Sequence, residues 1–84
     1  MAIDPDYLYA LLEQARVYGS LVANGFSSDP SADLSNALRA AERALQLAPN
    51  GVTALERKAR VLHWQGDLEG STALLRKVIA LDPL

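Results

Sequence analysis

The chain of 84 residues contains no cysteine and a single histidine, His63. Without cysteine it can form neither a disulfide nor a zinc–thiolate site, and it has no thiolate nucleophile. It also lacks a Gly-rich phosphate-binding loop, and no elbow motif surrounds any of its serines. His63 and Asp67 lie one helical turn apart, but a lone histidine more simply ends a helix near its negative pole than holds a metal. We therefore expect no catalytic activity, no cofactor and no metal site.

Long hydrophobic runs are absent as well. No apolar segment approaches the ~18 residues that a membrane helix requires, and the N-terminus lacks the basic, apolar and small-residue order of a signal peptide. The net charge of −2, from eight basic and ten acidic residues, offers nucleic-acid phosphate no general attraction. A cytoplasmic location is the default expectation, with neither a membrane nor a nucleic acid as partner.

The charge is divided unevenly along the chain. Residues 1–33 contain five acidic residues and one arginine, a net charge of −4, whereas the remainder contains seven basic and five acidic residues, a net charge of +2. A chain with this division of charge can associate head to tail. The simpler alternative is a solvated surface whose charges are placed at random.

Only five residues are aromatic, yet half of the chain is hydrophobic, and Ala and Leu dominate. This composition is typical of closely packed helices rather than of β-structure. Apolar residues recur at three- and four-residue spacing from Leu8 to Val22. They predict a first helix that starts at Asp4-Pro5, continues to about Asn24 and is ended by Gly25.

The rest of the chain predicts three further helices. A loop over residues 25–33 precedes the second helix, and either Asp29 or Asp33 caps that helix. The second helix continues to about Ala48, the third spans about Val52 to Gln65, and the fourth runs from Leu68 to about Leu81, before Asp82-Pro83. We expect a single all-α domain over residues 1–84, made of two stacked antiparallel hairpins at about 5–49 and 51–83.

The two predicted hairpins resemble each other in sequence. The block from Asp33 to Asn50 recurs 34 residues later, and its aspartate, leucines and proline repeat at Asp67, Leu68, Leu81 and Pro83. A second similarity joins residues 11–18 to residues 55–62, which share the sequence Ala-Arg-Val. Few folds produce a self-similarity of 34 residues.

This spacing resembles the tetratricopeptide repeat, whose hairpins combine large and small residues at set positions with a terminal proline. The matching residues are Leu11, Ala15, Tyr18, Ala37 and Pro49 in the first hairpin, and Leu55, Ala59, Leu62, Ser71 and Pro83 in the second. The resemblance implies a four-helix fragment of a right-handed α-solenoid. The first hairpin departs from the pattern by an insertion of ten residues, because Ala15 lies 22 residues before Ala37 and Ala59 lies 12 before Ser71. A long first hairpin of this kind is similar to repeat regions of multidomain bacterial signalling proteins.

The resemblance implies a protein-interaction module that binds a peptide or protein segment in a concave groove. Arg16 and Arg60 are equivalent residues, and two guanidinium groups on one wall can bind carboxylates of an acidic peptide beside Trp64. Alternatively, Arg16 and Arg60 pair with Glu13 and Glu56 as ordinary surface ion pairs, and Trp64 covers the hairpin end. The predicted groove residues are Tyr9, Leu12, Glu13, Arg16, Ser20, Thr53, Glu56, Arg57, Arg60, His63 and Trp64.

A second hypothesis is self-assembly, in which the fourth helix pairs with a copy of itself or with the first helix of a neighbouring chain. Two repeats without a capping helix leave the last helix partly uncovered, and an exposed apolar stripe commonly marks an interface. The predicted self-interface consists of Leu68, Thr72, Leu75 and Ile79. Three alternatives remain. The long first helix folds back over this stripe, the chain is a segment of a longer repeat array whose next unit covers it, or the chain is a spacer in a larger signalling protein.

Overall fold

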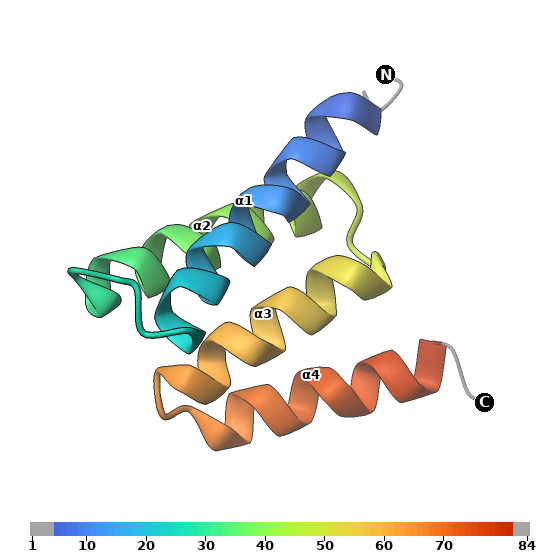
Figure 1. Ribbon diagram of the computed structural model, residues 1–84. Coiled ribbons are helices and arrows are strands. Elements are labelled where there is room, and N and C mark those ends of the chain that lie inside the picture. Colours follow the sequence, from blue (N-terminus) through green and yellow to red (C-terminus); the bar gives the residue numbers. More distant parts are fainter. Residues whose placement is uncertain (1–4, 82–84) are drawn as a thin grey trace.

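The computed structural model describes residues 5–81, which form four helices and no strand (Figure 1). The helices are α1 (Pro5–Ala23), α2 (Pro30–Leu47), α3 (Val52–Trp64) and α4 (Leu68–Leu81). The predicted all-α fold is therefore confirmed. The predicted cap Asp4 and the predicted ending at Asp82-Pro83 lie outside the described residues.

The four helices pack as two neighbouring antiparallel hairpins, with α3 in the middle. In Figure 1, α1 lies against α2 and α3 lies against α4, and α3 also packs on both helices of the first hairpin. Helices α1 and α4 lie on opposite sides of α3 and do not contact each other. The alternative in which the first helix folds back over the last is therefore wrong, because α3 separates the two.

Small side chains on α2 allow this close packing. Ala37, Ala41 and Ala44 are completely buried, and short side chains let neighbouring helix backbones approach one another. Ala44 packs with Leu11 of α1 and Ala54 of α3. Further along the hairpin, Ala37 packs with Leu34 and with Val61 of α3. One core is thus shared by α1, α2 and α3.

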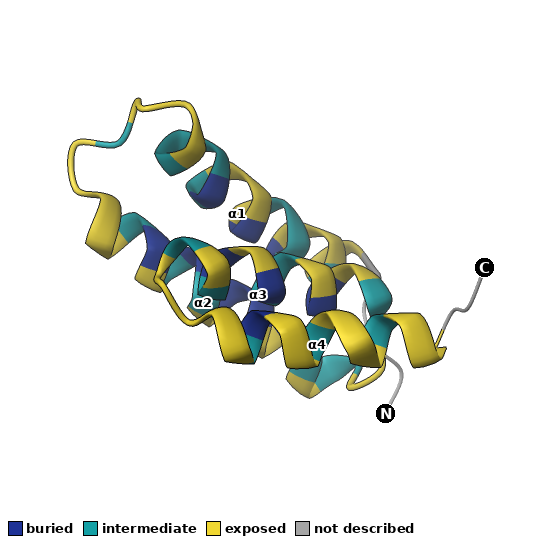
Figure 2. Ribbon diagram, turned by 90° about the horizontal axis from the view of Figure 1, so that it is seen from below, coloured by how far each residue is buried: buried dark blue, intermediate teal, exposed yellow. Residues whose placement is uncertain are grey.

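Helix α4 contributes far less to this core. Of its described residues, Ser71 alone is buried. Leu68, Leu75 and Ile79 are exposed by 58%, 46% and 65%, and Figure 2 shows most of α4 in the colour of exposed residues. The expectation that the last helix is partly uncovered is confirmed.

Glycines end both α1 and α3 in the same way. Gly25 and Gly66 have positive φ angles of 75° and 90°, a conformation that side chains disfavour. After α1, the amide of Phe26 donates to the carbonyl of Leu21 at 2.9 Å. After α3, the amide of Asp67 donates to the carbonyl of Leu62 at 2.8 Å. Both endings are Schellman motifs, which turn the chain sharply into the next helix.

Aspartates begin the second helix of each hairpin. The carboxylate of Asp29 accepts a hydrogen bond from the Ala32 amide at 3.2 Å, and that of Asp67 accepts one from the Gly70 amide at 2.9 Å. The predicted loop over residues 25–33 is therefore too long, since α2 already begins at Pro30. Asp29 and Pro30 together start the helix one turn earlier than Asp33.

The ten inserted residues are spread over three segments. Helix α1 ends eight residues after Ala15, whereas α3 ends five residues after Ala59. Six residues link α1 to α2, and three link α3 to α4. Helix α2 begins seven residues before Ala37, whereas α4 begins three residues before Ser71. The insertion therefore extends both helices of the first hairpin as well as the loop between them.

Replacement of Gly66 by alanine should destabilise the chain by about 1 kcal/mol, because a Cβ atom disfavours the positive φ angle that ends α3. Urea unfolding followed by circular dichroism measures the change. Gln65→Ala is the matched control, since the neighbouring Gln65 has an ordinary φ of −79° and is exposed. Equal unfolding midpoints for wild type and Gly66→Ala would contradict the assignment of this turn.

Candidate functional site

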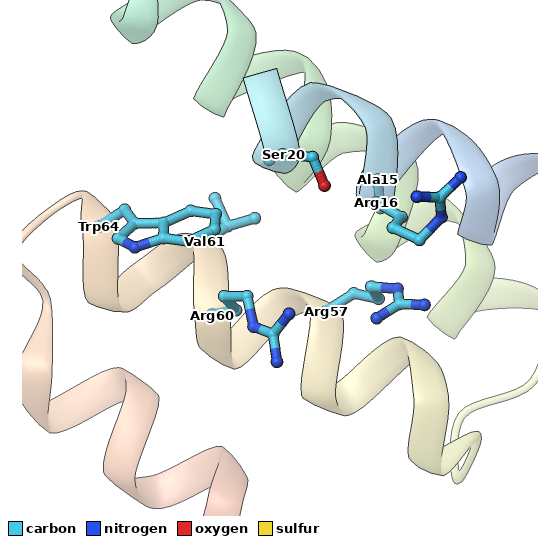
Figure 3. A pocket seen from close by; sticks show the side chains of 8 residues that line it. Ala15, Arg16, Ser20, Arg57, Arg60, Val61 and Trp64 are labelled. Carbon is cyan, nitrogen blue, oxygen red and sulfur yellow. The ribbon is translucent and has the colours of Figure 1, made fainter. Parts of the chain in front are cut away.

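Helices α1 and α3 enclose a small cavity that contains part of the predicted groove. Its volume of about 20 Å³ holds roughly one water-sized group, so that a larger ligand has to lie across its mouth. Figure 3 shows side chains from both helices around it. The lining residues are Ala15, Arg16, Gly19, Ser20, Arg57, Arg60, Val61 and Trp64.

One end of the cavity is closed by Trp64, which lies against Gly19 of α1. A Cβ atom added to Gly19 would lie 3.1 Å from Cζ3 of the indole, a distance tighter than ordinary van der Waals contact. The ring is half-buried and packs against the core cluster of Leu34, Ala37 and Val61. Trp64 therefore covers the end of the core, in agreement with the alternative in which it covers the hairpin end. It also lines the cavity.

The other end of the cavity is basic. Figure 3 shows the guanidinium groups of Arg16 and Arg57 at this end, whereas Arg60 extends away from α1. The Nε atom of Arg57 is buried and has no hydrogen-bond partner among the described residues. A buried donor without a partner carries the full cost of its lost hydration. Of the three arginines that line the cavity, Arg57 therefore gains the most free energy from an added hydrogen-bond acceptor.

Arg16 is already paired. Its Nη2 atom lies 2.8 Å from Oε2 of Glu13, one turn earlier on α1, and Nε donates to the same oxygen at 3.2 Å. This confirms for Arg16 the simpler alternative, an ordinary surface ion pair with Glu13. For Arg60 the simpler alternative is wrong, because within residues 5–81 no ion pair joins it to Glu56. The two candidate pairs also differ in spacing, because Glu13 lies three residues before Arg16 and Glu56 lies four residues before Arg60.

The pKa of the Glu13 carboxyl lies below its ordinary value. The main cause is the hydrogen bonding from Arg16, and the positive charges of Arg16 and Arg57 act in the same direction against a desolvation effect. Glu13 thus experiences the field of arginines on both helices. Among the described residues, Glu13 is the one carboxylate paired with an arginine at this end of the cavity, so the two guanidinium groups can accommodate a second carboxylate.

The remaining residues of the predicted groove lie elsewhere. Tyr9, Leu12 and Thr53 line neither the α1–α3 cavity nor the hollow beside it, and Leu12 packs against the core cluster around Leu11. Glu56 and His63, together with Arg60, line a second hollow between α3 and α4. The predicted groove is therefore divided in two, with Arg60 at the border.

The α3–α4 hollow is larger and more apolar than the first cavity. It has a volume of about 380 Å³. Leu75 and Ile79 of the predicted self-interface line it, whereas Leu68 and Thr72 line a neighbouring hollow on α4. Ala59, Ser71 and Val78 also line it, although neither the predicted groove nor the predicted self-interface includes them. Their positions in the 34-residue repeat could have identified them as residues that line a groove.

Two further features bear on function. Phe26, in the loop between α1 and α2, is 79% exposed, which favours a role in binding for this loop. Across residues 5–81, no helix is long and apolar enough to cross a membrane, and no cluster of three potential metal ligands occurs.

Comparison of the chain with protein-family models, with curated proteins and with solved structures gives no match in any of the three.

Arg16→Gln should raise the pKa of Glu13 toward its ordinary value, and Arg57→Gln should raise it by less, because Arg16 donates hydrogen bonds while Arg57 acts through charge alone. A carboxyl-detected NMR titration of Glu13 measures both changes. A larger shift in Arg57→Gln than in Arg16→Gln would show that the two arginines are arranged differently.

Proposed function

We propose that this chain is a non-catalytic adaptor of the tetratricopeptide-repeat type, which binds an acidic segment of a partner protein across the mouth of the α1–α3 cavity. The observation that carries the proposal is the buried Nε atom of Arg57, which lacks a hydrogen-bond partner among the described residues. A carboxylate of the partner supplies the missing acceptor, either directly or through a water molecule held in the cavity. Arginine is well suited to this role because its planar guanidinium can donate two parallel hydrogen bonds to a carboxylate.

The flanking residues give the bound segment its position. Arg60 adds a second positive charge on α3, and no ion pair neutralises it within the described chain. Trp64, at the opposite end of the cavity, offers an aromatic edge to an apolar side chain of the segment. The module would thus recognise carboxylates followed at a short distance by an apolar residue.

The 34-residue repeat and the packing of α3 on the first hairpin support a repeat fold for this module. In this proposal the chain acts as a scaffold in the cytoplasm, as part of a bacterial multidomain signalling protein. It performs no chemistry itself and works by holding partners together.

The binding proposal is tested with a fluorescent peptide that contains four glutamates followed by leucine, and with a matched peptide in which glutamines replace the glutamates. Fluorescence anisotropy should show binding of the first peptide alone. Arg57→Gln should weaken binding about tenfold, since a charge-assisted hydrogen bond contributes about 1.5 kcal/mol or more.

Arg39→Gln is the matched control, because Arg39 is an exposed arginine of α2 outside the cavity. It should bind the peptide like the wild type. Equal weakening in both variants would show that net charge alone attracts the peptide. No binding of the glutamate peptide, or binding unchanged by Arg57→Gln, would contradict the proposed site and favour a spacer.

A further inference from the structure

The α3–α4 hollow is the repeat equivalent of a groove that is already filled in the first hairpin. An offset of 44 residues relates Ala15 of α1 to Ala59 of α3, and an offset of 34 residues relates α2 to α4. By these offsets the hollow residues Ser71, Leu75 and Val78 correspond to Ala37, Ala41 and Ala44. The first hairpin thus shows what the corresponding surface of the second hairpin can accept.

In the first hairpin this surface is covered by a helix. Ala37 packs with Val61 of α3, Ala44 packs with Ala54 of α3, and both alanines are completely buried. In the second hairpin Leu75 is 46% exposed, although its counterpart Ala41 is completely buried. The two hairpins present corresponding surfaces, one occupied by α3 and the other open.

The chain carries a second helix of the kind that fills this groove. Helix α3 uses Ala54 and Val61 for the contact, and their counterparts on α1 are Ala10 and Val17. Both counterparts are exposed, Val17 by 45%. Helix α1 therefore exposes the same residue types that α3 buries in its contact with the first hairpin.

These two surfaces cannot meet within one chain, because α3 separates α1 from α4 (Figure 1). Between two chains they can meet, and one pair of opposite charges would then meet as well. By the offset of 44 residues, Arg60 of the hollow corresponds to Arg16, and Glu13 of the docking helix corresponds to Arg57, which lies at the same end of the cavity as Arg16 (Figure 3). Opposite charge steers two surfaces together and fixes their orientation.

We infer that α1 of one copy docks into the α3–α4 hollow of a second copy, so that the chains join head to tail. Ala10 then lies against Val78 and Val17 against Ser71, as Ala54 lies against Ala44 and Val61 against Ala37 within one chain. The contact covers Leu75 and Ile79 as well. Because the two surfaces differ, a dimer keeps one free surface at either end, and the assembly grows beyond a dimer. This inference does not depend on the acidic segment.

Sedimentation velocity over a hundredfold concentration range tests the inference. The wild-type mass should rise with concentration past twice the 9.0 kDa of the monomer. Val17→Asp places a charge on the docking face of α1, and Leu75→Asp places a charge in the hollow. Each variant alone should therefore remain monomeric. Circular dichroism should show unchanged helix content, because both side chains are exposed.

An equal mixture of the two variants is the decisive sample. The intact hollow of Val17→Asp should accept the intact α1 of Leu75→Asp, and the mixture should stop at a dimer. Leu68→Asp is the matched control, since Leu68 is an exposed leucine of α4 outside the hollow, and it should assemble like the wild type. A monomeric wild type, a self-associating Val17→Asp, or a mixture that stays monomeric would overturn the inference.

Discussion

The packing of α3 into the groove between α1 and α2 is the contact on which the rest of the structure depends. Ala44 and Ala37 of α2 are completely buried and pack with Ala54 and Val61 of α3, and their short side chains let the two helix backbones approach. Larger side chains there would push α3 outward, because a packed core tolerates added volume poorly. The position of α3 in turn places Trp64 against Gly19 and buries Nε of Arg57. It also determines where α4 lies, because α4 packs on α3. The interior and both candidate surfaces therefore follow from one helix–helix contact.

The features determined by local chemistry could be predicted from the sequence. Apolar spacing and the glycines at positions 25 and 66 predict four helices and two of their ends, because these signals act within a few residues. The start of α2 was ambiguous, since Asp29 and Asp33 both suit a helix cap, and Pro30 favours the earlier one. Features that depend on the approach of α3 to α1 could not be predicted. They include the burial of Arg57 and the division of the predicted groove into a cavity and a hollow.

The repeated hairpin connects the two proposed surfaces. Each hairpin presents a groove for the next helix, and α3 fills the first groove while the second remains open. Arg60 lines both the α1–α3 cavity and the α3–α4 hollow. By the 44-residue offset, a docked α1 would bring its Glu13 close to Arg60, so that opposite charges meet at the contact. Helix α4, with Ser71 as its one buried described residue, has the most stability to gain from such contact.

The contact between Trp64 and Gly19 provides the most direct test of the packing of α3. The indole carbon Cζ3 lies close enough to α1 that a Cβ atom on Gly19 would be 3.1 Å away. In a three-dimensional NOESY spectrum of the labelled chain, a strong cross-peak should therefore connect the indole ring protons to the Hα protons of Gly19. The absence of that cross-peak in a folded sample would contradict the packing of α3 against α1, and with it the geometry of both proposed surfaces.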